Sequence, residues 1–91
     1  GIESFLKDLD ERFASAGRTD LALIVKDRLA SIMERLEEWS EALDTVITIA
    51  DANLELGDIE QGIAYSTHQL RLARRLRARG TLKRLPTAGW H

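Results

Sequence analysis

The stretch LELGDIEQ, residues 54–61, contains the clearest helix end and helix start in the chain. Gly57 can adopt the left-handed backbone conformation that commonly ends a helix, because it has no β-carbon. Asp58 follows it, and aspartate is among the best N-cap residues. Apolar residues recur at helical spacing on both sides of this point. The stretch therefore predicts two helices joined by a short turn.

Two further breaks are predicted upstream of this turn. Gly17 ends a first helix, and Thr19 or Asp20 can cap the second. No strong breaker separates the second helix from the third, and the apolar spacing there would also permit one long coiled-coil helix. We favour a break near Trp39, with Ser40 as N-cap of the third helix.

The favoured break depends on which apolar side chains a core would use. One long helix would leave four of them outside its seam, whereas a core of four helices would bury them: Ile24, Met33, Ile47 and Ile49. The fourth helix is predicted from the same helical spacing of apolar residues. We expect one face to consist of Ile59, Ile63, Ser66, Leu70 and Ala73, with Tyr65, Leu72 and Leu76 beside it.

These patterns predict an all-α fold, a compact bundle of four to five antiparallel helices with short turns. The 91 residues suffice for one small domain. The sole proline is Pro86, so nothing before it forbids helix. We expect residues 1–80 to form the helical domain and residues 81–91 to form a short terminal helix or a flexible tail.

Charge is divided unevenly along the chain, although its net value is only −2. Every acidic residue lies at or before Glu60, and only bases follow. The basic part includes HQLRLARRLRARG, residues 68–80. Such a division indicates an intramolecular charge match, head-to-tail self-association or an acidic protein partner. The basic stretch can also be a solvated helix face or a nucleic-acid contact.

The basic residues are the candidate partner-binding side chains, because each guanidinium can pair with a carboxylate or phosphate. Exposed ion pairs are individually weak, about 0–1 kcal/mol, so binding would also need an apolar anchor such as Trp39, Tyr65 or Trp90. Trp39 is also typical of a residue that packs one helix turn on the next. The basic candidates are Arg71, Arg74, Arg75, Arg77, Arg79, Lys83 and Arg84.

The sequence predicts no catalytic, cofactor or metal site. There is no cysteine, the glycines are scattered singly, and the only histidines are His68 and His91. Ser66 and Thr67 adjoin His68, but adjacent helix residues point in different directions. His68 begins a weak match to the phosphoacceptor box of histidine kinases, which also needs a long second helix after it. We expect a partly exposed helix histidine there.

No apolar run approaches the roughly 20 residues of a membrane span, and the acidic first helix is unlike a signal peptide. We therefore expect no membrane insertion.

Four segments together resemble a known helical domain. They are FLKDLDERF, KDRLASIMERLEE, GDIEQGIAYSTHQL and GTLKRL. The resemblance is to the C-terminal domain shared by the scaffold subunit of the COPII outer coat and the steroid receptor RNA activator protein. Ile32 and Met33 stand at the Leu-Tyr positions of that family's second-helix motif. Between His68 and Lys83 the family usually has acids and a tryptophan, whereas this chain has arginines.

The resemblance implies a non-enzymatic assembly domain that is cytoplasmic and docks on coat subunits, or else a nuclear coregulator whose basic helix binds RNA. A second resemblance is to helical hairpins of the tetratricopeptide kind, carried by EEWSEAL and ELGDIEQGIAYSTHQL. Their turns lie 20 residues apart instead of 34. Gly62 stands where that family prefers alanine. This likeness implies an adaptor.

Overall fold

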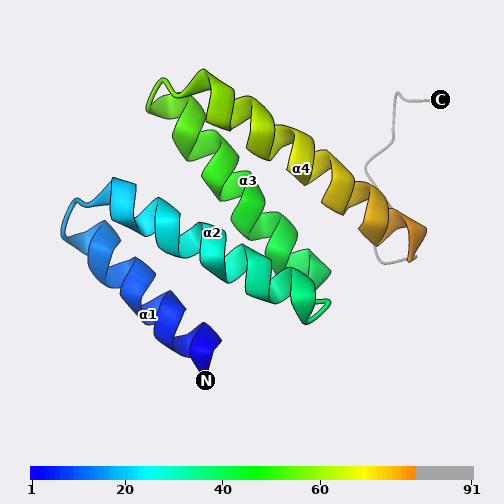
Figure 1. Ribbon diagram of the computed structural model, residues 1–91, viewed down its shortest axis with the longest axis horizontal. Coiled ribbons are helices and arrows are strands. Elements are labelled where there is room, and N and C mark those ends of the chain that lie inside the picture. Colours follow the sequence, from blue (N-terminus) through cyan, green and yellow to red (C-terminus); the bar gives the residue numbers. More distant parts are fainter. Residues whose placement is uncertain (80–91) are drawn as a thin grey trace.

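The computed structural model describes residues 1–79, which form four helices (Figure 1). They are α1 (Ile2–Ser15), α2 (Thr19–Arg35), α3 (Trp39–Glu55) and α4 (Ile59–Ala78). No strand occurs in this part of the chain, and consecutive helices run antiparallel with short turns. The predicted all-α bundle is confirmed. The possible fifth helix and the tail, residues 81–91, lie outside the described residues.

The three turns between the helices repeat one geometry every 20 residues. Gly17, Glu37 and Gly57 have φ angles of 74°, 60° and 83°. After each of them, a backbone N–H bonds back to a carbonyl five residues earlier, as in the bond from Asp58 N to Asn53 O at 2.9 Å. This is the Schellman pattern, which satisfies carbonyls at a helix end. The predicted stops at Gly17 and Gly57 are confirmed.

The helix starts agree with the sequence only in part. Asp58 caps α4 as predicted, because its side chain accepts a hydrogen bond from Gln61 N at 3.2 Å. The predicted caps of the second and third helices are wrong: Arg18 and Glu38 occupy those positions, and neither makes a side-chain cap bond. The break near Trp39 is confirmed, and Trp39 is the first residue of α3.

Glu37 is the turn residue that strains its backbone, since a side chain disfavours positive φ. We expect Glu37→Gly to be more stable to urea than Glu37→Ala by about 1 kcal/mol. Both variants lose the exposed pair between Glu37 and Arg79 Nη1, at 3.5 Å, so their difference isolates the backbone effect. Equal unfolding midpoints for the two variants would contradict this account.

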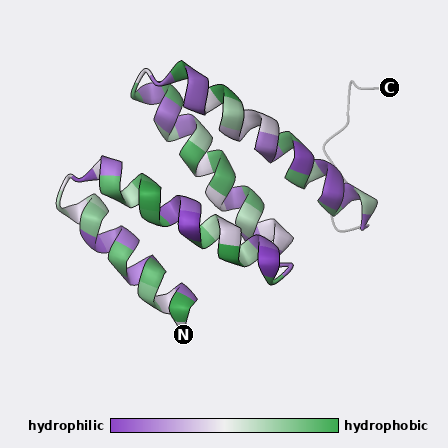
Figure 2. Cartoon of the chain, in the orientation of Figure 1, coloured by the Kyte–Doolittle hydropathy of each residue, from purple (hydrophilic) through white to green (hydrophobic). Residues whose placement is uncertain are grey.

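The core lies where each helix packs against its neighbours in the chain. Within residues 1–79, backbone contacts join α1 to α2, α2 to α3 and α3 to α4, so the helices form a sequential array. The most deeply buried large side chains are Val46, Ile49 and Leu76. Hydrophobic and hydrophilic residues alternate around every helix, and the end of α4 is largely hydrophilic (Figure 2).

Gly62 allows α4 to approach α3 closely. A β-carbon there would lie 2.3 Å from Leu54 Cδ2, so alanine would force the Leu54 side chain to move. The glycine that departs from the tetratricopeptide pattern thus has a packing reason in this chain.

The predicted apolar face of α4 is wrong. Ile59, Ile63 and Leu70 are 55%, 60% and 51% exposed, whereas Leu72 and Leu76 are buried. Two apolar stripes run along this helix, and periodicity alone could not decide which one faces α3.

Some of the core residues expected before α4 are buried, and others are exposed. Met33 and Ile49 are buried as predicted, and Ile47 is half-buried. Ile24 is exposed, so its assignment to the core is wrong. In α1, Leu6 is buried while Phe5 is exposed.

Candidate partner-binding surfaces

The exposed face of α4 combines apolar and basic side chains. Each residue of an α-helix is rotated by about 100° from the one before it, and the side chains of this face lie within an arc of about 60° around the helix axis. We call this face the outer stripe; it consists of Ile59, Ile63, Leu70, Arg74 and Arg77. No residue of the described chain forms an ion pair or a side-chain hydrogen bond with Arg74 or Arg77. The outer stripe therefore offers two uncommitted cations beside three exposed aliphatic side chains.

Two other arginines of the predicted site make contacts with side chains of the domain itself. The guanidinium carbons of Arg75 and Arg79 lie 4.8 and 5.3 Å from the centre of the Trp39 ring. Such cation–π contacts are favourable at this range. Arg79 also pairs with Glu37. Trp39 is half-buried against the core, so these contacts join the end of α4 to the turn between α2 and α3.

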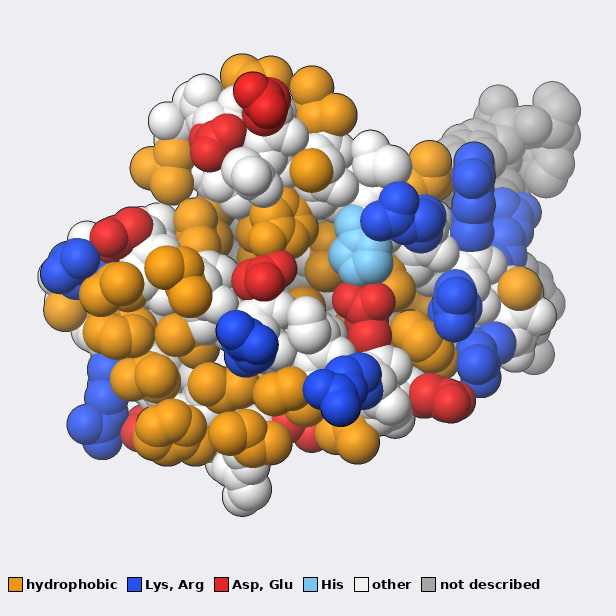
Figure 3. All heavy atoms as spheres, in the orientation of Figure 1, with side chains coloured by type: hydrophobic (Ala, Val, Ile, Leu, Met, Phe, Trp, Pro, Cys, Tyr) orange, Lys and Arg blue, Asp and Glu red, His pale blue; other side chains and the backbone are white. Residues whose placement is uncertain are grey.

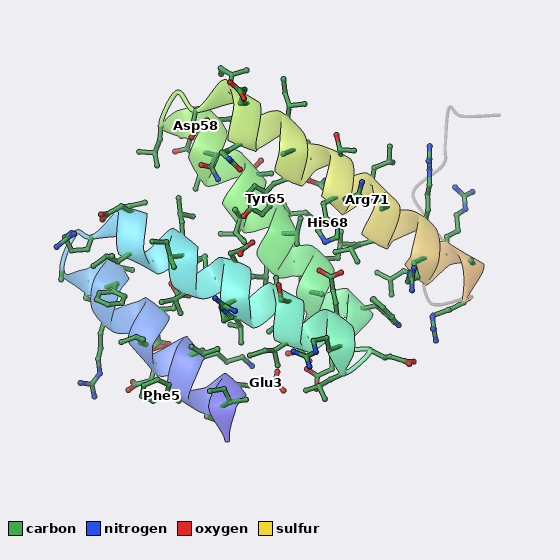
Figure 4. The ribbon with its side chains drawn as sticks, in the orientation of Figure 1. Glu3, Phe5, Asp58, Tyr65, His68 and Arg71 are labelled. Atoms are coloured by element: carbon green, nitrogen blue, oxygen red, sulfur yellow. The ribbon has the colours of Figure 1, made fainter. Side chains whose placement is uncertain are left out.

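Arg71 is part of a series of side-chain contacts that connects α4 to α2. Its Nη2 lies 3.1 Å from His68 Nδ1, and His68 Nε2 lies 2.8 Å from Glu34 Oε2 (Figure 4). A ring with its proton on Nε2 fits both contacts, because it donates to the carboxylate and accepts from the guanidinium. The histidine is partly exposed, as predicted. Lys83, Arg84 and Trp90 lie outside the described residues.

A groove of about 580 Å³ lies between α2 and α4. Its walls come from these two helices and the turn before α4, and its floor comes from α3. Figure 3 shows this face of the molecule, on which the pale blue side chain of His68 lies between acidic and basic groups. The lining residues that matter here are Asp20, Asp27, Asn53, Leu56, Asp58 and Tyr65.

Tyr65 connects the two walls of this groove. Its hydroxyl donates to Asp27 Oδ1 at 2.6 Å, and both Tyr65 and His68 point from α4 toward α2 (Figure 4). Burial, followed by this hydrogen bond and the negative charge of Asp27, raises the pKa of Tyr65 to about 12. The outer stripe lies on another side of α4, so the structure separates Tyr65 from Arg74 and Arg77.

The raised pKa can be measured directly, because Tyr65 is the sole tyrosine. We expect tyrosinate absorbance to appear with a pKa of about 12, compared with an ordinary value of 10.0. Asp27→Asn should lower this pKa only in part, since burial is the largest cause and remains. The native state holds the proton more tightly than the unfolded state does. This contribution to stability is therefore present below pH 10.0 and is lost as the pH rises through about 12. A pKa near 10.0 in the folded protein would contradict the structure.

The sequence did not identify this groove. Asp27 and Tyr65 lie 38 residues apart, and no linear spacing connects them. The repeated 20-residue spacing of the turns was the available signal, and it corresponds to the like turns at Gly17, Glu37 and Gly57.

No family model matches the chain, and no curated protein or solved structure is significantly similar to it. The resemblances to the coat-scaffold domain and to tetratricopeptide hairpins thus stay predictions. Residues 1–79 contain no group of three or more histidine, aspartate or glutamate side chains that could hold a metal ion. None of the described helices is both long and apolar enough to span a bilayer.

Proposed function

We propose that this protein is a non-enzymatic protein-interaction module that binds an acidic, amphipathic segment of a partner protein through the outer stripe. The observation that carries the proposal is the exposure of Ile59, Ile63 and Leu70 in line with Arg74 and Arg77. Aliphatic side chains in this position gain about 25 cal/mol per Å² when a partner covers them.

The partner's chemistry follows from the order of side chains along the stripe. Ile59 and Ile63 lie in the first half of α4, and Leu70 lies in the second half, where the two uncommitted arginines follow it. A helix whose apolar side chains precede or follow a pair of carboxylates would match both halves at once. The arginines alone would add little, because exposed ion pairs are worth about 0–1 kcal/mol each.

The resemblance to the coat-scaffold domain supports a cytosolic assembly role, with another coat subunit as the partner. A coregulator role in the nucleus is the alternative under the same resemblance, and an adaptor role is the alternative under the tetratricopeptide likeness. All three roles use a surface and need no reaction centre.

The test is a pull-down from cytosolic extract with and without nuclease. The wild-type protein is compared with Arg74→Glu/Arg77→Glu and with Ile63→Ser/Leu70→Ser. Arg28→Glu/Arg35→Glu is the matched control, because it makes the same charge change at exposed positions on α2. We expect both stripe variants, and not the control, to lose most of the recovered partner.

Two outcomes would overturn the proposal. If the stripe variants recover the same proteins as the wild type, Arg74 and Arg77 are a solvated surface only. If recovery depends on nucleic acid and the wild type retards RNA in a gel with steep salt dependence, the stripe binds phosphate instead.

Self-association between the acidic and basic halves is a separate prediction. Light scattering at low salt and high protein concentration should detect dimers that dissociate as salt is added. A strict monomer under these conditions would rule it out.

A further inference from the structure

We propose that the groove between α2 and α4 is a second binding site, which takes an extended peptide segment and places a lysine or arginine side chain against Asp27. This site is independent of the outer stripe and lies on another side of α4. Its ligand has the opposite charge to the ligand of the stripe. Three features of the groove carry the inference.

The first feature is the sign of its charge. Among the residues that the structure describes, the charged side chains that line the groove are Asp20, Asp27 and Asp58, and no lysine or arginine lines it. Asp20 is occupied by Arg18, whose guanidinium contacts both of its carboxylate oxygens. Asp27 and Asp58 each use one oxygen, for Tyr65 and for the backbone of Gln61. Each therefore keeps one oxygen without a partner among residues 1–79.

The second feature is a buried amide on the floor. Asn53 is only 9% exposed, and its Nδ2 donates to Ile49 O at 2.9 Å. Its Oδ1 accepts no hydrogen bond from the described residues, although it belongs to a buried side chain of the groove lining. This oxygen is not among the fully buried unpaired atoms of residues 1–79, which are Glu38 Oε1 and Trp39 Nε1, so it is accessible from the groove. A ligand that donates an N–H to this oxygen would take the place of water there.

This acceptor favours an extended peptide as the ligand. In a bound helix most backbone N–H groups are already used within the helix, whereas an extended segment presents them to its surroundings. A simple metal ion is disfavoured, because residues 1–79 hold no cluster of three suitable ligands.

The third feature is the apolar rim. Leu56 and Ile24 are 61% and 65% exposed, and both line the groove beside the aspartates. Aliphatic stems of lysine and arginine cover such surfaces while their charged ends reach a carboxylate. A volume of about 580 Å³ lies in the usual range for ligand sites. The fitting ligand is thus a peptide with a basic residue next to a leucine or isoleucine.

The test uses the capped peptide TLKRLP, which repeats residues 81–86 and has two basic residues between two leucines. Binding to the full-length protein is measured by fluorescence anisotropy, and the control peptide is TLQQLP. We expect the control peptide to bind at least tenfold more weakly. We expect a similar loss for TLKRLP with the variant Asp27→Asn/Asp58→Ser, in which serine keeps the helix cap.

A matched control separates local charge from total charge. Glu11→Gln/Asp51→Asn also removes two negative charges, both from exposed side chains outside the groove lining, and should change the affinity less than twofold. Asn53→Ala should weaken binding without any change in charge. The Asn53 side-chain amide resonance of the wild type should shift when TLKRLP is added.

The site would be overturned by equal binding of the two peptides, by no binding of TLKRLP, or by equal losses in the two charge variants. Lys83→Gln/Arg84→Gln is measured in parallel. If TLKRLP binds this variant and does not bind the wild-type protein, the ligand of the groove is the chain's own basic segment. That result would overturn the proposal of a separate partner. Arg74→Glu/Arg77→Glu should bind TLKRLP normally, so failure of the outer stripe and failure of the groove are distinguishable.

Discussion

Replacing Leu76 by alanine is expected to lower the free energy of unfolding by about 2–5 kcal/mol. Leu76 is 1% exposed on the inner face of α4. Its truncation removes buried apolar surface and leaves a cavity that the packed helices can only partly close. Because small domains have a total stability of about 5–15 kcal/mol, this single change removes a large share of it.

Leu70→Ala is the matched control, because it makes the same substitution on the same helix. Leu70 is 51% exposed, so we expect its truncation to change the unfolding free energy by less than about 0.5 kcal/mol. Urea unfolding followed by circular dichroism measures both variants. Ile49→Val, with an expected loss of about 0.5–1.5 kcal/mol, extends the comparison if Leu76→Ala is partly unfolded. Equal losses at the two leucines would mean that the inner and outer faces of α4 are wrongly assigned.

The sequence predicted the elements of this fold well because their ends are local. A glycine that takes positive φ and an aspartate that caps the next helix act within one turn of the chain, as at Gly57 and Asp58. The break at Glu37 was harder to predict, because glutamate has no preference for positive φ. Only the expected burial of four apolar side chains favoured a break there, and of these Met33 and Ile49 are buried, Ile47 is half-buried and Ile24 is exposed.

The surfaces were less predictable, because they depend on which face each helix turns inward. Arg75 and Trp39 were both candidate partner-binding residues, and the structure brings them into contact with each other. No pattern in the sequence connects these positions, which lie on different helices. Of the candidate arginines on α4, Arg74 and Arg77 have no partner among residues 1–79, and the sequence grouped them with arginines that serve the fold.

The same reasoning explains why the groove was missed and the stripe was partly found. A stripe lies on one helix, so its members share a periodicity that can be read from the sequence. The groove needs α2, α3 and α4 together, and its contact between Tyr65 and Asp27 forms only once these helices are packed.

Replacing Lys26 by methionine is expected to cost about 1.5–3 kcal/mol of unfolding free energy. Lys26 Nζ lies 2.5 and 2.6 Å from the two carboxylate oxygens of Asp10, and this pair joins α2 to α1. The two side chains are only 21% and 17% exposed. Methionine keeps most of the side-chain volume but leaves the Asp10 carboxylate half-buried without its cation, which is the costly situation.

Two comparisons show whether burial is the cause. The exposed pair of Arg12 and Asp8, whose side chains are 75% and 59% exposed, lies at 3.1 Å, so Arg12→Met should cost less than about 1 kcal/mol. The double variant Asp10→Leu/Lys26→Met should recover most of the loss, because no charge is then left behind. Urea unfolding of the four proteins of this cycle gives the coupling energy between Asp10 and Lys26. If Lys26→Met and Arg12→Met cost the same, or the double variant is the least stable, the pair contributes through its side-chain packing and its charges contribute little.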